Sequence, residues 1–369
     1  MTPIPYVNIA AQWESERQEI LPLIEEVFAS GNYIGGSIVE DFEISAANLC
    51  ETKHCVALNS GTDALVLGLV AMGVGRGDEV ITPPNSFIAS TAAIIHIGAI
   101  PVFVDVLDDQ NIDPELIAAA ITPKTKAIMP VHLTGRMARM DRIKQIAEES
   151  NIPIIEDAAQ AIGSRYRNIP SGKWGRVGCF STHPLKNLNA CGDGGFLVTD
   201  DDAIATKIRI MRNHGLSDRN TATHFGFVSR MDAVQAAILK YRINKLDDVT
   251  RKRRENAALY KALLNPNKVF VPSELEYEFN TYHTFVIQVN NRDGLREYLA
   301  KAGVETSIHY PIPIHLQPAA ASLGYIEGAF PNTEVQAKRI LTLPVNHFIN
   351  IEQVRIISGL VNEFYDKFK

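Results

Sequence analysis

The chain has 369 residues, of which 46% are hydrophobic, and its formal net charge at pH 7 is −6. This size is sufficient for a large core and predicts two domains. The negative charge argues against nucleic acid or an anionic membrane as the main partner. No run approaches 18 uninterrupted apolar residues, so we expect no membrane span.

The N-terminal residues 1–5 contain neither a basic region nor an apolar stretch of the kind that secretory signals have. The four cysteines, Cys50, Cys55, Cys179 and Cys191, form no Cys-x-x-Cys pair. We therefore expect buried thiols in a reducing cytoplasm, and neither a disulfide framework nor a metal site.

Strands and helices are expected to alternate from about Trp13 to Lys245. Such a pattern predicts an α/β fold with a mostly parallel sheet, covered on both faces, that binds its ligand beyond the carboxyl ends of the strands. The expected strands are 78–82, 101–105, 126–131 and 153–156, and helices are expected at 86–97 and 140–149.

The first segment with chemical content is 56–67, which is typical of a strand, a tight turn and a helix. Gly61 permits a sharp turn. Thr62 and Asp63 would open a helix whose free N–H groups and dipole favour an anion such as a phosphate. An ordinary capped helix without a ligand is the alternative.

The second segment is 153–161, a short apolar strand that ends in two acids. Asp157 at its end is a candidate carboxylate for the pyridinium nitrogen of pyridoxal phosphate, because the protonated ring is the electron sink in that chemistry. A helix N-cap without chemistry is the alternative interpretation of Asp157.

The third segment places Lys186 in a short loop between two apolar strands, next to the Gly-rich turn 192–195. An amine in such a place is suited to form a Schiff base with pyridoxal phosphate. Ser181, at the end of the preceding strand, could add a hydroxyl to the phosphate site. A lysine that simply faces water is the alternative.

Beyond the third segment, one long helix is expected from Met231 to about Leu264, linking the two domains. The large cofactor-binding domain would comprise residues 1–250, including the N-terminal segment, and the small C-terminal domain would comprise residues 251–369. The small domain should contain a strand at 284–289 and helices at 293–301 and 351–369.

These segments closely resemble the sugar aminotransferases of the DegT/DnrJ/StrS group over essentially the whole chain. The resemblance implies a fold-type I aminotransferase, with a large domain around a seven-stranded-type, mostly parallel sheet and a smaller α+β domain. The matching motifs are 60–65 (SGTDAL), 77–82 (GDEVIT), 101–105 (PVFVD), 128–133 (IMPVHL), 156–160 (EDAAQ), 180–187 (FSTHPLKN), 192–195 (GDGG), 212–215 (RNHG) and 308–318 (IHYPIPIHLQP).

The resemblance also implies roles for individual residues. Lys186 would carry the cofactor and shuttle a proton, and Asp157 would hold the ring nitrogen. Gln160 would lie near the ring hydroxyl and Phe87 would stack on the ring, although a core aromatic is the alternative for Phe87. The residues expected to bind the cofactor are Gly61, Thr62, Phe87, Asp157, Gln160, Ser181 and Lys186; those expected to face the substrate are His183, His309, Tyr310 and His315. The last three are polar residues of a Pro-rich loop, for which a packed structural loop is the alternative.

The resemblance further implies a homodimer, in which segments 212–215 and 226–232 of one subunit complete the site of the other. One position departs from the family. Val228 stands where the family has an asparagine that reaches the neighbouring subunit's cofactor phosphate, and valine has no side-chain donor.

The expected reaction is transfer of an amino group from glutamate to a keto sugar, foremost a nucleotide-linked keto-deoxyhexose for cell-surface polysaccharide or glycoside synthesis. The alternative is a free keto sugar acid such as 8-oxo-3,8-dideoxy-octulosonate, destined for lipopolysaccharide, whose carboxylate would need Arg212, Arg219 or Arg230. A sugar dehydratase is disfavoured, because those relatives typically carry histidine at the position of Lys186. A regulatory sugar-binding protein is the alternative from another class.

Overall fold

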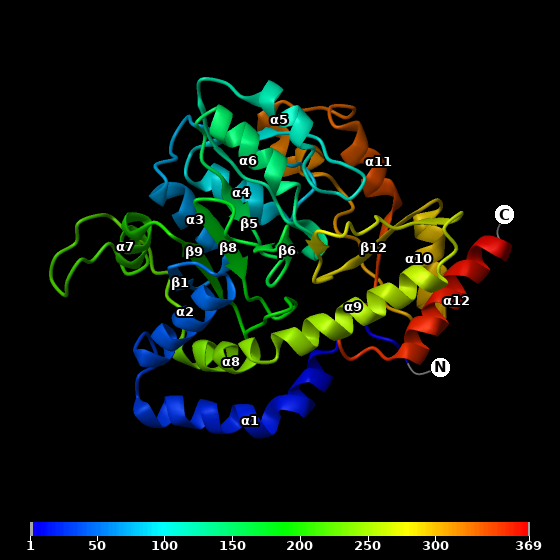
Figure 1. Ribbon diagram of the computed structural model, residues 1–369, viewed down its shortest axis with the longest axis horizontal. Coiled ribbons are helices and arrows are strands. Elements are labelled where there is room, and N and C mark those ends of the chain that lie inside the picture. Colours follow the sequence, from blue (N-terminus) through cyan, green and yellow to red (C-terminus); the bar gives the residue numbers. More distant parts are fainter. Residues whose placement is uncertain (1–2, 368–369) are drawn as a thin grey trace.

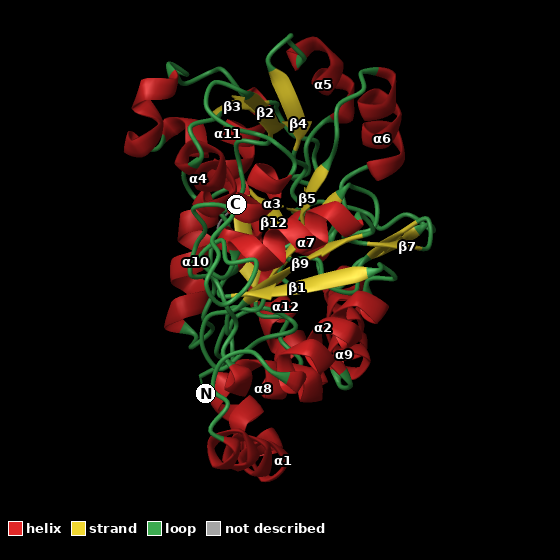
Figure 2. Ribbon diagram, turned by 90° about the vertical axis from the view of Figure 1, so that its left-hand side faces the viewer, coloured by secondary structure: helices red, strands yellow, loops and turns green. Residues whose placement is uncertain are grey.

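The computed structural model describes residues 3–367, and a large twisted sheet lies at its centre (Figures 1 and 2). Parallel bridges from Ile128 to Ile154 and from Val131 to Asp157 join two ladders into this one sheet. The ladders are β1 (His54–Leu58), β9 (Gly195–Thr199), β8 (Val177–Ser181) and β5 (Ile155–Asp157), and β4 (Thr125–Ile128), β2 (Glu79–Thr82) and β3 (Ile100–Phe103).

Of these seven strands, only β9 runs antiparallel to its neighbours. The other pairs are parallel. The predicted α/β fold with a mostly parallel seven-stranded sheet is therefore confirmed.

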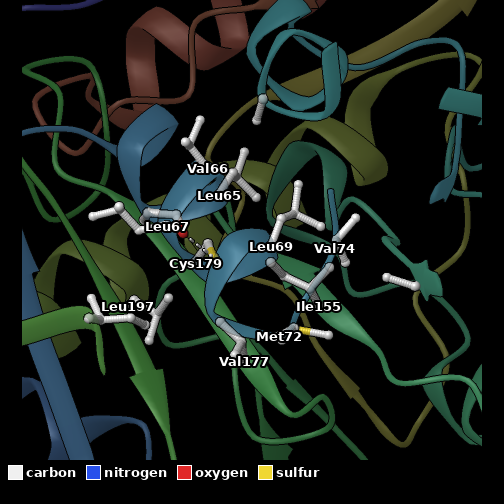
Figure 3. Close-up of a cluster of buried hydrophobic side chains, with 14 of the residues drawn as sticks. Leu65, Val66, Leu67, Leu69, Met72, Val74, Ile155, Val177, Cys179 and Leu197 are labelled. Carbon is white, nitrogen blue, oxygen red and sulfur yellow. Dashed lines mark hydrogen bonds between the residues drawn. The ribbon is translucent and has the colours of Figure 1, made fainter. Parts of the chain in front are cut away.

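Two helical layers cover the sheet because alternate side chains of its strands enter two separate apolar cores. Val56 and Leu197 belong to one core, whereas Ala57 and Phe196 belong to the other. Figure 3 shows the first core, in which the thiol of Cys179 donates to the carbonyl of Ala64 at 3.2 Å. The first layer contains α3 (Gly61–Ala71), α4 (Ile88–His96) and α7 (Asp202–Met211), and the second contains α2 (Ser37–Leu49) and α8 (Ala233–Ile243).

Further elements extend these layers. Near β2 and β4, α5 (Pro114–Ala120) and α6 (Met140–Glu149) enclose a separate apolar cluster. The long helix α1 (Ile9–Ser30) packs on α8. A small antiparallel sheet contains β7 (Ile169–Pro170), β6 (Arg165–Tyr166) and β11 (Glu278–Phe279).

A second large core lies in the C-terminal part of the chain. Its antiparallel sheet contains the strand expected at 284–289, which is confirmed. The helices expected at 293–301 and from residue 351 are also confirmed. Residues 368–369 of the last expected helix lie outside the described residues. The elements are β10 (Val269–Phe270), β12 (Phe285–Val289), β13 (Ile340–Leu343), α9 (Leu246–Leu263), α10 (Arg292–Lys301) and α12 (Ile351–Lys367).

Between these elements run α11 (Pro331–Arg339) and short 3-10 turns at Leu133–Gly135, Ile314–Leu316 and Pro318–Leu323. No helix within residues 3–367 is long and apolar enough to cross a bilayer.

The expected single helix over 231–264 is wrong, because the chain forms two helices, α8 and α9. At the junction the Asn244 and Lys245 N–H groups bond to the carbonyls of Tyr241 and Arg242, three residues back, at 3.2 and 3.0 Å. The Asn244 amide donates to the carbonyl of Lys240 at 3.4 Å. These tighter and competing hydrogen bonds end the first helix.

The proposed domain boundary at residue 250 falls within α9. Leu246 packs in the core of the large sheet, while Ala257 and Tyr260 pack in the C-terminal core. Ile4, from the segment assigned to the large domain, also packs in the C-terminal core and bridges to Val304. The division into 1–250 and 251–369 stays a prediction, and the N-terminal residues depart from it.

Candidate active site

A cavity of about 360 Å³ opens beyond the carboxyl ends of β5 and β8. One wall comes from the large sheet and the start of α3. The other wall comes from α9, from the C-terminal part of the chain and from the N-terminal residues 6–7. The cavity brings together ten of the predicted residues, namely Gly61, Thr62, Phe87, Asp157, Gln160, Ser181, His183, Lys186, His309 and Tyr310.

Asp157 ends β5 and is only 4% exposed. Its carboxylate accepts hydrogen bonds from the Ser90 hydroxyl at 2.6 Å and from the Ala159 N–H at 3.2 Å. Burial raises the pKa of this carboxyl, while those two hydrogen bonds and the nearby Lys186 and His132 lower it. No helix follows Asp157 within residues 158–161, so the helix-cap alternative is wrong.

Lys186 lies in the loop after β8, where its backbone N–H donates to the carbonyl of His183 at 2.8 Å. Its amine has no acceptor within hydrogen-bonding distance among the residues that the structure describes. Burial lowers the pKa of Lys186 to about 8, and Asp157 opposes that shift. Near pH 8, a substantial fraction of the molecules therefore has a neutral Lys186 amine, and the neutral amine is the nucleophilic form.

The start of α3 forms an anion cradle. The Ser60 hydroxyl caps the helix by accepting from the Asp63 N–H at 3.1 Å. The N–H groups of Gly61 and Thr62 belong to the first helical turn, which has no intrahelical acceptors. Such N–H groups and the helix dipole favour a phosphate.

Gly61 is required for a close approach and not for the sharp turn that we predicted. Its φ is not positive, whereas an added Cβ would lie 2.6 Å from the Cβ of Ser181. Likewise, an added Cβ on Gly195 would lie 2.3 Å from the carbonyl carbon of Ser60. The ends of β8 and β9 thus touch the start of α3, which places Ser181 at the cradle.

Gln160 and Phe87 lie on either side of Tyr310. The Gln160 amide donates to the Tyr310 hydroxyl at 3.3 Å and accepts from the Thr134 N–H at 2.8 Å. The Phe87 ring is 56% exposed and its centroid lies 5.8 Å from that of Tyr310. Phe87 is therefore not a core aromatic, and Gln160 lies in a turn.

The sequence interpretation missed several residues of the opposite wall. Tyr6 and Arg253 line the cavity with His283 and Asn346, although they are far apart in sequence. Arg253 lies in a helix segment so rich in charge that nothing in the sequence distinguishes it. Ser90 was also missed. The available signal was its hydroxyl, which lies one turn after Ser86 in a helix that follows a strand end.

His315 is a correction to the predicted site. It is 2% exposed, its Nε2 lies 3.0 Å from the Glu334 carboxylate, and its ring packs 4.8 Å from that of Phe330. These contacts hold it in a separate cluster away from the cavity, so the structure does not support a substrate contact there.

None of the arginines expected to bind a sugar acid lines the cavity of its own chain. Arg212 pairs with the Glu43 carboxylate at 2.5 Å, and Arg230 donates to the Asn213 side chain at 3.1 Å. Arg219 belongs to the segment after α7 that projects from the body (Figure 1).

The cavity residues fit pyridoxal phosphate. An unpartnered amine, a buried carboxylate and a phosphate cradle surround one hollow, which corresponds to the aldehyde, the ring nitrogen and the phosphate of that cofactor. When bound, the cofactor supplies a carbonyl carbon that condenses with amines and a ring that accepts an electron pair.

Comparison with known proteins agrees with this fit. The model of the DegT/DnrJ/EryC1/StrS aminotransferase family matches residues 14–361. The chain is 41% identical to the "Pleiotropic regulatory protein" of Geobacillus stearothermophilus, over 99% of each chain. It is 38% identical to the dTDP-3-amino-3,4,6-trideoxy-alpha-D-glucose transaminase of Streptomyces venezuelae, over 99% of this chain and 97% of the relative.

Among solved structures, that of S. venezuelae DesV in complex with a ketimine intermediate is similar to this one with a TM-score of 0.97, at 39% identity and 99% coverage of each chain. Other structures of this fold contain pyridoxal phosphate or its amine form. The protein is therefore a sugar aminotransferase that uses pyridoxal phosphate, and it belongs to the DegT/DnrJ/EryC1/StrS aminotransferase family.

Proposed function

We propose that the protein transfers an amino group from glutamate to a nucleotide-linked keto sugar, foremost a keto-deoxyhexose, for cell-surface polysaccharide or glycoside synthesis. The observation that carries this proposal is the convergence of Lys186, Asp157 and the cradle at Gly61 on one cavity. The name of the S. venezuelae transaminase, which specifies a dTDP-linked amino sugar, supports the nucleotide-linked acceptor.

Lys186 has two tasks in this proposal. Its Nζ would hold the cofactor covalently in the resting enzyme. Once an amino donor had taken its place, the freed Nζ would be available to accept the proton of the donor's α-carbon and to release it again. The lowered pKa, about 8, suits an amine that must both accept and release a proton near neutral pH.

The other residues hold the cofactor in register. Asp157 would accept the ring N–H, and the Ser90 hydroxyl at 2.6 Å orients its carboxylate. Gly61, Thr62 and Ser181 would hold the phosphate. Phe87 would cover one ring face and Gln160 would contact the ring hydroxyl.

His183, His309 and Tyr310 are proposed to contact the sugar. Burial lowers the pKa of His309 to about 4, so it is neutral at pH 7 and its ring nitrogens can accept or donate a single hydrogen bond. The His309 Nδ1 lies 2.9 Å from the Thr342 hydroxyl. That contact leaves Nε2 for a sugar hydroxyl.

A homodimer is proposed as the working unit. The segment after α7 carries exposed apolar side chains, with Phe225 fully exposed and Val228 56% exposed. An exposed apolar surface of this kind is typical of an interaction site. The Val228 carbonyl accepts from the Asn59 amide at 3.3 Å, so the end of this segment lies beside the cradle of its own chain, and its exposed apolar part is proposed to contact a second copy.

Besides the free sugar acid, two further alternatives are weaker than this proposal. A regulatory role is named for the G. stearothermophilus relative, but a binding protein needs neither Lys186 nor Asp157. A dehydratase is disfavoured by Lys186 itself. Cys50, Cys55 and Cys179 are buried thiols as expected, whereas Cys191 is exposed, which corrects the expectation for that residue. The free thiols support the proposed cytoplasmic location.

Competition by thymidine and uridine diphosphates tests the nucleotide-linked acceptor. A nucleotide-linked sugar gains affinity from its base and diphosphate, so the free diphosphates should inhibit at millimolar levels or below. If neither inhibits while a keto sugar acid such as 8-oxo-3,8-dideoxy-octulosonate turns over, the sugar-acid alternative replaces the proposal.

A further inference from the structure

Arg253 of α9 is a buried cation without a counter-ion. It lines the cavity and is 5% exposed. Its Nη1 donates to the carbonyls of Tyr282 and His283, each at 3.1 Å. Its Nε is buried and has no acceptor, and among residues 3–367 no carboxylate forms an ion pair with it.

The other buried arginines of the described chain all have such a partner. Arg242 pairs with Glu16 at 2.7 Å, Arg136 with Glu278 at 3.4 Å, and Arg292 with Asp293 at 2.6 Å. An unpaired buried guanidinium is costly. Arg253 therefore differs from the rest in a way that an anion entering the cavity would explain.

One donor of Arg253 remains for a carboxylate. Nη1 is occupied by the two carbonyls and Nε is buried, which leaves Nη2 without an acceptor among the described residues. A guanidinium N–H and a carboxylate oxygen form a charge-assisted hydrogen bond. Burial lowers the pKa of Arg253 to about 10, so the side chain remains charged at neutral pH.

The charge of the cavity favours the amino donor as the source of that carboxylate. Lys186 is occupied by the cofactor in the resting enzyme, and among residues 3–367 Arg253 is the only arginine that lines the cavity. The ring of a neutral keto sugar offers it no anion, and in a nucleotide-linked sugar the ring itself separates the diphosphate from the keto carbon that reacts. Glutamate, in contrast, must bring its carboxylates to the centre of the cavity with its amine.

We propose that Arg253 binds a carboxylate of the amino donor and thereby positions the donor's amine for reaction at the site of Lys186. This inference rests on the proposed use of glutamate. It makes Arg253 a determinant of donor choice, separate from the residues that contact the sugar.

The test is to titrate the cofactor-loaded enzyme with glutarate, a dicarboxylate without an amine, and to follow the cofactor absorbance. Arg253→Gln should weaken glutarate binding by about 10- to 100-fold, as expected for the loss of a charge-assisted pair. The rate at which glutamate converts the cofactor should fall in parallel at low glutamate, whereas conversion by 1-aminopropane should not change.

Arg254→Gln is the matched control. Arg254 also lies on α9 and donates to a nearby carbonyl, that of Asn280, at 2.8 Å, but it pairs with Glu274 at 2.6 Å. The Arg254→Gln substitution should leave glutarate binding unchanged. Arg253→Lys keeps the charge without the guanidinium and should give an intermediate affinity, which also guards against a misfolded Gln variant.

Unchanged glutarate binding in Arg253→Gln would overturn the inference. Equal losses with glutamate and 1-aminopropane would also overturn it, because they would show that Arg253 only supports the 282–283 segment. If the unaltered enzyme does not react with glutamate at all, the proposed donor is wrong instead.

Discussion

At the residue scale, Asp157 and Lys186 depend on each other. Burial raises the pKa of the carboxyl and lowers that of the amine, and each group opposes the shift of the other. When the Lys186 amine is consumed, Asp157 loses a nearby cation. A protonated ring nitrogen would restore the charge balance, which explains why a buried carboxylate is tolerated at this position.

Lys186→Ala should abolish the visible absorbance of the bound cofactor while leaving the fold intact. The surface variant Lys124→Ala should keep that absorbance. Borohydride reduction followed by peptide mapping gives a direct measurement, and a label on any lysine other than Lys186 would contradict the assignment.

Asp157→Ala should reduce the rate of glutamate conversion by about 10²- to 10⁴-fold, the range that a well-placed proton-holding group supplies. Cofactor binding should suffer less, because the cradle at α3 and Lys186 remain. Stopped-flow absorbance measures the rate and equilibrium dialysis the affinity. Near-normal turnover would show that Asp157 has only a structural role.

The lowered pKa of Lys186 predicts a pH dependence of cofactor attachment. Only the neutral amine attacks the aldehyde, so the attachment rate of cofactor-free protein should rise with pH up to about 8 and then level off. An amine with the usual value would give a rate that rises toward pH 10. Continued increase above pH 9 would contradict a buried, shifted amine.

The convergence of residues on one cavity was predictable where a backbone motif accompanied them. Asp157 ends β5 and Lys186 lies in the loop after β8, and the carboxyl ends of parallel strands converge. His315 was predicted from a loop rich in polar residues, but loop sequence does not fix side-chain direction, and Glu334 holds it elsewhere. Arg253 and Tyr6 could not be found because only the tertiary fold brings them to the cavity.

At the element scale, the contact of β8 and β9 with the start of α3 builds the cradle. Gly195→Ala should lower the free energy of unfolding by about 1–3 kcal/mol, the usual cost of overpacking, because its Cβ would lie 2.3 Å from the Ser60 carbonyl carbon. Denaturant unfolding checks this, and cofactor affinity should fall with it.

Gly359→Ala is the control for that prediction. Gly359 lies inside α12 with nothing within 4 Å of an added Cβ, so alanine should stabilise the helix by about 0.5–1 kcal/mol. Equal effects of the two substitutions would show that the close approach at Gly195 is not required.

The positions of the helices and strands were predictable from apolar runs. The residues at which they end were harder to predict. The strand expected at 284–289 forms as β12, whereas the helix expected over 231–264 breaks at Asn244. The break depends on hydrogen bonds three residues back and on the Asn244 side chain. Helical periodicity continues on both sides and does not reveal it.

At the scale of the whole molecule, the exposed segment after α7 predicts a second copy. A Phe225→Asp variant should be monomeric by light scattering and should lose activity, since the partner would no longer complete the site. A fully active monomer would contradict the proposed dimer.

Complementation tests the same dimer without depending on stability. Lys186→Ala and an inactive variant at Arg230 should partly restore activity when mixed and refolded, because mixed dimers contain one intact site. Absence of rescue, with mixed dimers verified by mass, would place each site within a single chain.

The overall architecture was predictable because alternating strands and helices allow few topologies. The contribution of Ile4 to the C-terminal core was not, because a single apolar residue near the terminus carries no pattern. The substrate is similarly beyond the sequence, since the walls of the cavity come from segments that only the fold assembles.

The most direct test of the central claim is a two-step absorbance measurement on the purified enzyme. Glutamate should first remove the absorbance of the aldehyde form of the cofactor. A dTDP-linked keto-deoxyhexose added after removal of glutamate should then restore it stoichiometrically and yield the amino sugar. Full response to glutamate with no recovery from any nucleotide-linked keto sugar, but recovery with a free keto sugar acid, would contradict the proposed acceptor.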